Sequence, residues 1–353
     1  MRTDIATVAE LDQFDALLDV RSPAEFAEDH VPGALSVPVL DDAERARVGT
    51  LYKQVSPFLA RKVGAALVAR NIARHIDEKF VDHDRRWQPL VYCWRGGKRS
   101  GAMTIILREI GWDARQLEGG YKAFRRHVIQ ELEVLPPRLD LRVVCGMTGA
   151  GKSRLIRALA ARGAQVIDLE ALAAHRGSVL GGLPEAPQPS QKAFETRLWQ
   201  VLRRLDPRRP VYVESESRKI GDLRVPEPLI ARMWTASCVV LEADATLRVA
   251  LLMDEYAHFL TDRAALADRL SALIALHGHA RIDRWLELAD AHRHEELVAE
   301  LLELHYDPAY RRSIGSHYAT LATAPVLTVA ATAGPAAFDR LAAQLVNEEQ
   351  VAA

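Results

Sequence analysis

A single cysteine lies in a stretch of the chain that is rich in glycine and positive charge. The segment VYCWRGGKRSG, residues 91–101, places Cys93 directly after a short β-type run. The thiolate is the reactive form of cysteine, and nearby amides and cations lower its pKa. Paired glycines permit the backbone dihedrals with which successive N–H groups surround an anion. The segment predicts a nucleophilic thiolate, although a cysteine buried at a strand end would also fit. We expect anion binding around Cys93 by Trp94, Arg95, Gly96, Gly97, Lys98 and Arg99.

A second glycine-rich loop follows later in the chain. The segment GMTGAGKS, residues 146–153, matches the pattern G-x-x-x-x-G-K-[ST] and lies between an apolar run and a helical pattern. In this pattern, backbone amides surround a di- or triphosphate, the lysine reaches the terminal phosphates and the hydroxyl binds Mg²⁺. Cys145, directly before the loop, is expected to be inert core. We expect phosphate binding by Gly146, Met147, Thr148, Gly149, Ala150, Gly151, Lys152 and Ser153.

The residues that would support Mg²⁺ beside this loop are less regular. Phosphate-loop NTPases use an aspartate at the end of a later strand, whereas PVYVESES, residues 210–217, offers Glu214 and Glu216. We expect Mg²⁺ at Ser153 with these glutamates in support, or else ion pairs from them to Arg218 or Lys219. The missing aspartate disfavours rapid ATP hydrolysis and leaves room for a diphosphate that is not a nucleotide.

Each loop needs a strand before it and a helix after it, and the flanking patterns supply both. Apolar runs alternate with helical patterns in both halves, which predicts two α/β domains with mainly parallel sheets. A length of 353 residues also favours two domains. Because Pro136 and Pro137 interrupt the pattern, we place one domain at 1–135 and a second at 136–353. Residues from about 246 to 310 form a helical, highly charged segment of the second domain.

The composition is that of an ordinary globular protein with a formal net charge of −1. It contains no apolar run of about eighteen residues, the length from which a membrane-spanning helix would be predicted, and the acidic N-terminus lacks an apolar signal core. The three cysteines fit a reducing compartment and predict neither a disulfide framework nor a four-ligand zinc site. We therefore expect a cytoplasmic protein without membrane attachment and without a structural metal.

The first half of the chain resembles rhodanese domains. DVRSPAEFAEDHVPGALSVP, residues 19–38, is similar to their opening segment, and LEGGY, residues 117–121, to their closing segment. This likeness covers nearly all of residues 1–135 and outweighs the C-x-x-x-x-x-R spacing of cysteine phosphatases, which Cys93 and Arg99 also match. It implies that Cys93 accepts sulfur or selenium in a persulfide-type intermediate. Arg21 and His30 are expected to be structural, because a histidine at such a turn commonly fixes the turn.

Over essentially its whole length the chain resembles the tRNA 2-selenouridine synthase family. The likeness is carried by ERARVGTLYKQ (44–54), YCWRGGKRS (92–100), GGYKAFRR (119–126), DLEALAAHRGSVLGG (168–182), PSQKAFE (189–195) and VESESRKIG (213–221). It implies transfer of a geranyl group from geranyl diphosphate to the sulfur of 2-thiouridine at the tRNA wobble position. Selenium from selenophosphate then replaces the geranylthio group. The resemblance implies that Cys93 carries selenium and that residues 146–153 bind the isoprenoid diphosphate.

A tRNA substrate requires cationic contacts, because its phosphates supply most of the affinity. We expect the anticodon arm to dock on the helical segment of about 246–310, although such helices also pack an apolar stripe onto a sheet. A further expected partner is the enzyme that supplies selenophosphate. The candidate tRNA contacts are Arg125, Arg126, Arg176, Arg218, Lys219, Arg311 and Arg312. The alternative is that these side chains are ordinary solvated surface charges without a role in binding.

Two other functions fit the same motifs. One is a P-loop kinase or NTPase with a regulatory rhodanese module, which predicts nucleotide turnover coupled to Mg²⁺. The other is a thiosulfate sulfurtransferase whose second domain only binds a partner, which predicts cyanide-dependent sulfur transfer without RNA.

Overall fold

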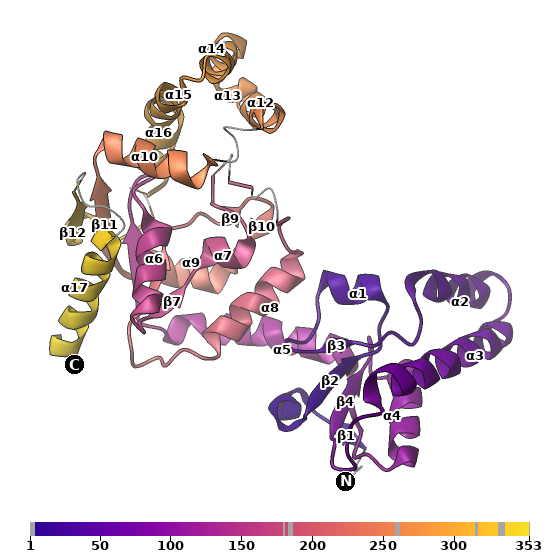
Figure 1. Ribbon diagram of the computed structural model, residues 1–353. Coiled ribbons are helices and arrows are strands. Elements are labelled where there is room, and N and C mark those ends of the chain that lie inside the picture. The colour runs from indigo at the N-terminus through magenta and orange to yellow at the C-terminus, as the bar shows by residue number, and fades with distance from the viewer. Residues whose placement is uncertain are drawn as a thin grey trace. The chain divides into compact units, whose positions relative to one another are not determined.

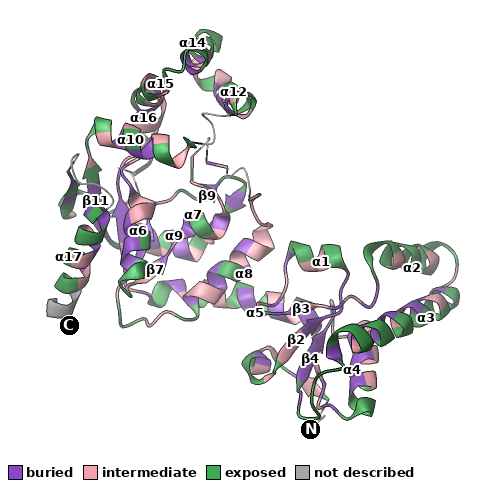
Figure 2. Ribbon diagram, in the orientation of Figure 1, coloured by how far each residue is buried: buried purple, intermediate pink, exposed green. Residues whose placement is uncertain are grey.

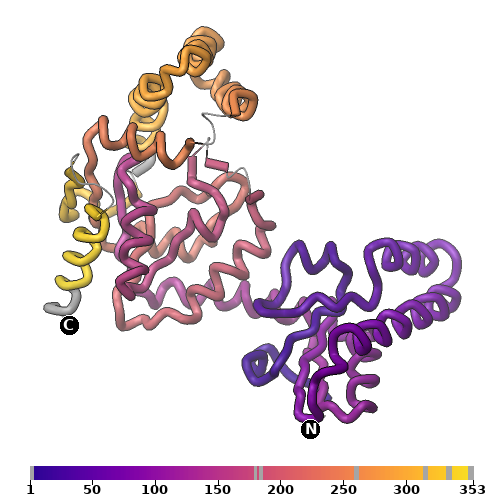
Figure 3. The backbone as a smooth tube through the Cα atoms, in the orientation of Figure 1, coloured from indigo at the N-terminus to yellow at the C-terminus, as the bar shows by residue number. Residues whose placement is uncertain are grey.

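The computed structural model describes residues 4–178, 181–182, 186–257, 262–314, 317–330 and 336–352 (Figure 1). The chain forms two compact units. The first contains Met1–Glu131 and Glu195–Gln200, and the second contains Leu132–Phe194 and Val201–Ala353. Figure 3 traces the backbone through both units in chain order.

The first unit is built on a five-stranded parallel sheet with the strand order β1-β5-β4-β2-β3. The strands are β1 (Ile5–Ala6), β2 (Ala16–Asp19), β3 (Leu35–Ser36), β4 (Pro89–Tyr92) and β5 (Arg115–Leu117). The middle strand β4 is buried throughout, as expected for a parallel strand covered on both faces. The helices are η1 (Val8–Gln13), α1 (Pro23–Glu28), α2 (Asp42–Gln54), α3 (Pro57–His75), η2 (Ile76–Phe80), α4 (Lys98–Ile110) and α5 (Gly120–Val134).

The second unit contains another five-stranded parallel sheet, with the order β12-β11-β6-β8-β7. Its strands are β6 (Leu141–Cys145), β7 (Gln165–Ile167), β8 (Val211–Glu214), β11 (Ser237–Ala243) and β12 (Val326–Val329). An antiparallel ribbon joins β9 (Lys219–Ile220) to β10 (Leu223–Arg224). The surrounding helices are η3 (Pro136–Arg138), α6 (Lys152–Ala161), α7 (Leu169–Ala173), α8 (Gln191–Leu202), α9 (Glu227–Trp234), η5 (Leu321–Thr323) and α17 (Ala336–Ala352).

A helical region is inserted between β11 and β12. It comprises α10 (Ala245–Glu255), α12 (Arg263–Ser271), α13 (Ile274–His277), α14 (His279–Asp290), α15 (His294–Leu301), η4 (Leu302–Tyr306) and α16 (Asp307–Ile314). Several of these helices share an apolar core of their own around the fully buried Trp285. Figure 1 shows α12 to α15 on the far side of α10 from the sheet. The helical segment predicted to end near residue 310 therefore continues to Ile314.

The predicted fold class is confirmed, since both units are α/β with parallel sheets flanked by helices. The strands β4 and β8 are buried throughout, and the edge strands β3 and β12 are partly exposed (Figure 2). Both glycine-rich loops follow the middle strand of their sheet, β4 or β6. Sites of open α/β folds form at the carboxyl ends of such strands. Among the described residues, we find no helix with the length and apolarity needed to cross a membrane.

Candidate active site

Cys93 lies directly after β4 and is 4% exposed. Its Sγ atom accepts hydrogen bonds from the Gly97 amide at 3.2 Å and from the Ser100 hydroxyl at 3.1 Å. Helix α4 begins at Lys98, so its amino-terminal end also faces this loop. A helix amino terminus carries a partial positive charge that favours an anion. The sequence-predicted loop therefore surrounds the sulfur with donors.

The pKa of Cys93 is lowered by these donors. Burial alone raises the pKa of this thiol, but hydrogen bonds from the Ser100 hydroxyl and from the amides of Ser100, Gly97 and Arg95 outweigh the burial. The Gln116 side-chain amide donates to the Ser100 hydroxyl oxygen at 2.7 Å, which leaves the hydroxyl hydrogen for Cys93. Sequence reasoning did not select Ser100 or Gln116. A hydroxyl in the first turn of α4 was the available signal for Ser100.

The closing segment of the first unit holds the cysteine loop in place. The amides of Tyr121 and Lys122 donate to the carbonyls of Cys93 and Trp94 at 2.9 and 3.0 Å. Gly120 has a φ of +58°, and a Cβ atom there would lie 2.2 Å from the Cys93 carbonyl oxygen. A glycine is therefore required for this approach.

The cations of the cysteine loop differ in their availability. Arg95 and Lys98 are exposed, whereas Arg99 is half-buried. The Arg99 guanidinium donates to Glu25 at 3.0 Å, and Arg45 contacts the same carboxylate at 3.1 Å. Arg95 and Lys98 are thus the cations of this loop that face solvent.

Arg21 and His30 have structural contacts. Arg21 is 1% exposed, forms an ion pair with Asp19 at 2.6 Å and lies 3.9 Å from the centre of the Tyr121 ring. His30 stacks on Phe26 with ring centroids 3.9 Å apart. Arg21 therefore ties the opening segment to Tyr121, and His30 makes its contact within the opening segment.

The phosphate loop connects β6 to α6. Gly151 is the N-cap of α6 with a φ of +90°, and the next residue, Lys152, donates from Nζ to the Gly146 carbonyl at 3.0 Å. The Gly146 amide donates to the hydroxyl oxygen of Tyr310 in α16 at 2.7 Å. Residues 146–153 therefore lie together with the lysine folded over the loop, as the motif predicts.

The helical region also contacts the phosphate loop, through Arg248. Arg248 of α10 donates from Nε to the Thr148 carbonyl at 2.8 Å. The same guanidinium pairs with Asp307 of α16 at 2.5 Å, and Arg248 is only 5% exposed. Sequence reasoning missed both residues and Tyr310, because their contacts join segments far apart in the chain.

Three carboxyl groups gather beside Lys152 and Ser153. The Ser153 hydroxyl donates to Glu170 at 2.5 Å, and the Glu170 amide donates to Glu214 at 2.8 Å. Burial raises the pKa of Glu170, raises that of Glu214 strongly, and brings that of Glu216 to about 8, with neighbouring carboxylates adding to each rise. Partly protonated carboxyls repel a bound phosphate less than ionised ones.

The hydroxyl and carboxyl groups beside the phosphate loop are the potential protein ligands of Mg²⁺. The sequence pointed to Glu214 and Glu216, but Glu170 is the carboxylate that contacts Ser153. Glu214 is fully buried, and its Oε2 atom has no hydrogen-bond partner among the described residues. The described residues contain no cluster of three or more His, Cys, Asp or Glu side chains arranged to hold a metal. One hydroxyl with carboxylates nearby suits Mg²⁺, which keeps several waters and binds substrate phosphates.

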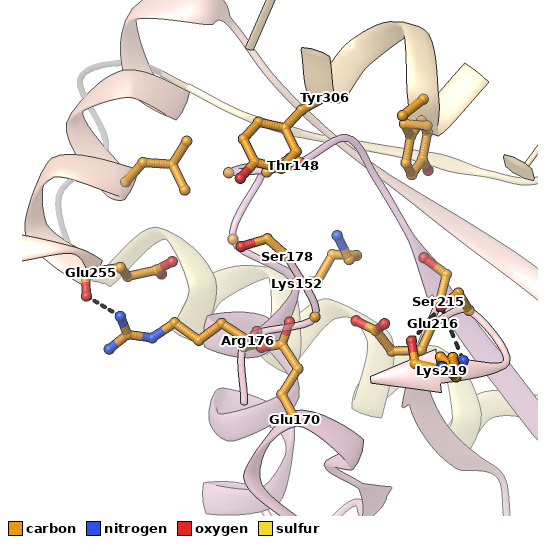
Figure 4. A pocket seen from close by; sticks show the side chains of 18 of the residues that line it. Thr148, Lys152, Glu170, Arg176, Ser178, Ser215, Glu216, Lys219, Glu255 and Tyr306 are labelled. Atoms are coloured by element: carbon orange, nitrogen blue, oxygen red, sulfur yellow. Dashed lines mark hydrogen bonds between the residues drawn. The ribbon is translucent and has the colours of Figure 1, made fainter. Parts of the chain in front are cut away.

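A cavity of about 590 Å³ opens above the phosphate loop. Lys152, Glu170, Arg176 and Glu216 line it and appear together in Figure 4. Arg218 and Lys219 also line this cavity. Its aromatic lining consists of Trp234, Tyr256, Tyr306, Tyr310, His317 and Tyr318.

The predicted tRNA contacts have different surroundings. Arg176, Arg218 and Lys219 line the cavity, where Arg218 also pairs with Glu227 at 3.2 Å. Arg125 is 12% exposed and forms an ion pair with Glu195. Of the predicted contacts that do not line the cavity, Arg126, Arg311 and Arg312 are exposed.

Comparisons with known proteins match both units. Residues 6–127 match the model of the rhodanese-like domain, and residues 139–272 match that of the tRNA 2-selenouridine synthase AAA domain. The chain is 31% identical to a tRNA 2-selenouridine synthase of Bdellovibrio bacteriovorus, over 86% of this chain and 90% of that protein. It is 36% identical to one from Nitrosomonas europaea, over 68% of this chain and 63% of that protein. It is 39% identical to one from Marinobacter nauticus, over 68% of this chain and 65% of that protein.

Proposed function

Because the chain belongs to the tRNA 2-selenouridine synthase family, we propose that it replaces the sulfur of 2-thiouridine in tRNA by selenium. The base is the wobble uridine, and the reaction passes through an S-geranyl intermediate. The observation that carries the proposal is the presence of two different anion loops in one chain that matches the family over both units. One loop contains a thiol and the other a lysine.

In the first step the phosphate loop binds geranyl diphosphate. The bond between C1 of the geranyl group and the diphosphate oxygen breaks, and a bond forms between C1 and the sulfur of 2-thiouridine. The diphosphate leaves with the electron pair, and the uridine loses its N3 proton. Lys152 and the loop amides stabilise the charge that develops on the leaving group.

The residues of this loop are compatible with a Mg²⁺ ion that would bind the diphosphate together with the protein. Ser153 would hold the ion, with Glu170 and Glu216, which also line the cavity, in support through water. Glu214, which the sequence also suggested, is fully buried and does not line the cavity. When bound, Mg²⁺ would neutralise part of the charge on the leaving diphosphate. Lys152, Glu170 and Glu216 all line the cavity in which the diphosphate would lie.

In the second step the Cys93 thiolate, held among the amides of its loop, attacks the phosphorus of selenophosphate. The P–Se bond breaks, selenium leaves with the electron pair as hydrogen selenide, and water later hydrolyses the S–P bond. Selenium takes the place of the geranylthio group at C2 of the base. Geranylthiol leaves with the electrons of the C–S bond, and phosphorus ends as phosphate with an oxygen from water. Arg95 and Lys98 are exposed and attract the anionic donor.

The partner is a tRNA bound through its anticodon arm, with a selenophosphate-supplying enzyme as a second partner. Of the predicted contacts, the exposed Arg126, Arg311 and Arg312 and the cavity-lining Arg176, Arg218 and Lys219 are our candidates for phosphate contacts. Arg125 is not retained, because its side chain is only 12% exposed and is paired with Glu195, whereas the paired Arg218 is 59% exposed. The three free cysteines agree with a reaction in the cytoplasm.

The proposal is tested by mass analysis of tRNA nucleosides from cells that lack the protein. Loss of 2-selenouridine with retention of 2-thiouridine is expected. In a second assay, purified protein, tRNA and geranyl diphosphate should yield S-geranyl-2-thiouridine, and selenophosphate should then convert it to 2-selenouridine. Nucleotide hydrolysis without a change in tRNA would favour a P-loop NTPase. Cyanide-dependent sulfur transfer alone would favour a thiosulfate sulfurtransferase.

A further inference from the structure

We propose that the isoprenoid chain of the phosphate-loop substrate lies in an apolar recess formed by α10, α12 and α15, and that this recess limits the chain length. This inference rests on the proposed function, because it concerns the substrate of the same loop. It adds a binding site for the hydrocarbon part of that substrate.

The recess is lined by apolar side chains from three helices. Leu252 and Met253 come from α10, Leu266 from α12, and Leu297, Val298 and Leu301 from α15. Its volume is about 60 Å³. A cavity with such a lining excludes water and accepts hydrocarbon.

The recess adjoins the cavity above the phosphate loop. Thr148, Ser178, Leu252, Tyr256 and Tyr306 line both. In Figure 4, Thr148 and Tyr306 lie on the same side of the cavity, with Lys152 below them. A ligand whose diphosphate contacts Lys152 can therefore extend past Tyr256 and Tyr306 into the recess.

The chemistry of the recess favours a hydrocarbon over a nucleotide base. A buried base needs hydrogen-bond partners for its polar edge, because an unpaired polar group is costly to bury. The Ser178 and Tyr256 hydroxyls at the mouth already contact each other at 3.0 Å. His294 also lines the recess, and its Nδ1 atom has no hydrogen-bond partner among the described residues. A polar ligand would use that nitrogen, and His294→Leu separates the two kinds of occupant.

The small volume means that the recess would accept only the end of the chain, with the rest in the adjoining cavity, and this would limit the chain length. Leu297 and Leu301 are each 3% exposed and belong to the core of the helical region, so their side chains close the recess. Leu301→Ala would lengthen the space available, and Val298→Trp would fill it from a half-buried position. Leu288→Ala is the matched control, because Leu288 is 1% exposed in the same core and does not line the recess.

The first measurement is direct binding of geranyl diphosphate and of inorganic diphosphate to the full-length protein. The wild type should bind geranyl diphosphate at least about tenfold more tightly, because each buried methylene adds affinity. Val298→Trp should remove this preference while leaving the affinity for inorganic diphosphate unchanged. His294→Leu should keep the preference. Equal affinities in the wild type, or loss of the preference in His294→Leu, would overturn the proposal.

The second measurement compares geranyl and farnesyl diphosphate as donors to 2-thiouridine tRNA. Leu301→Ala should raise the ratio of kcat/KM for farnesyl over geranyl about tenfold or more, and Leu288→Ala should leave it unchanged. If the wild type transfers geranyl but Leu301→Ala keeps the wild-type ratio, the proposed recess is refuted and the proposed function is not. A wild type that binds geranyl diphosphate selectively but never alkylates tRNA would refute the proposed function and leave the binding site supported.

Discussion

Replacing Ser100 by alanine removes one of the hydrogen bonds that stabilise the Cys93 thiolate. The Ser100 hydroxyl and the Gly97 amide donate to Sγ at 3.1 and 3.2 Å, so the variant leaves a buried thiolate with fewer donors. A hydrogen bond to a charged group contributes about 1.5–3 kcal/mol, and about 1.4 kcal/mol corresponds to a factor of ten. The pKa of Cys93 should therefore rise in Ser100→Ala. At pH values below both pKa values the thiolate fraction should fall about ten- to a hundredfold.

The assay is the rate at which iodoacetamide alkylates Cys93, followed by mass analysis of the peptide that contains it. At acidic pH the rate in Ser100→Ala should fall by the factor given above. At the alkaline plateau it should not fall, because a thiolate of higher pKa is intrinsically more nucleophilic. Gln116→Ala should act in the same direction with a smaller effect, since Gln116 only orients the Ser100 hydroxyl.

Thr104→Ala is the control for this experiment. Thr104 is buried in the same helix and donates to the Ser100 carbonyl at 3.0 Å, a contact that does not involve the sulfur. Its pH profile should match that of the wild type. An unchanged profile in Ser100→Ala would refute the assigned role of the hydroxyl, and an equal loss of rate at every pH would indicate a misfolded loop.

Three further predictions concern the two loops and the tRNA. Cys93→Ser should abolish selenium incorporation and leave geranyl transfer intact, as nucleoside mass analysis would show; full selenation by this variant would contradict the role of Cys93. Lys152→Ala should lower geranyl transfer about 10²–10³-fold and spare selenation when geranylated tRNA is supplied, whereas equal loss in both assays would indicate a structural loop. The double variant Arg218→Ala, Lys219→Ala should weaken tRNA binding and reduce the log–log salt slope by about one per lost phosphate contact. A slope equal to that of the wild type would mean that the tRNA binds elsewhere.

The sequence was sufficient to predict the two loops because each is encoded locally. A strand, a run of glycines and a helix start follow one another without interruption in both segments. Backbone amides supply most of the donors, so the positions of the donors follow from the path of the chain. Cys93 and Lys152 could accordingly be assigned to their loops before any tertiary contact was known.

The partners of the loops could not be predicted because they come from distant segments. Tyr310 meets the Gly146 amide, and Arg248 meets the Thr148 carbonyl, only after the helical region has folded beside the sheet. The carboxylate that contacts Ser153 posed the same difficulty. Glu214 ends a strand and matched the expected pattern, but Glu170 lies in the first turn of α7, next to Ser153. Periodicity identifies the strand end and gives no distance between neighbouring loops.

Helix α10 contacts both the phosphate loop and the proposed binding recess, so the proposed isoprenoid chain and the loop would be coupled through one helix. Helix α10 provides Arg248 to the Thr148 carbonyl and Leu252 to the recess. Leu252 also lies against the loop, since a Cβ atom at Gly149 would be 2.9 Å from its side chain. A chain seated in the recess would therefore restrain α10, and α10 in turn restrains the loop that binds the diphosphate. Inorganic diphosphate has no hydrocarbon chain and would therefore not contact the recess. Under this proposal, the segment that was expected from the sequence to dock tRNA, or to pack an apolar stripe onto the sheet, would also select the isoprenoid donor.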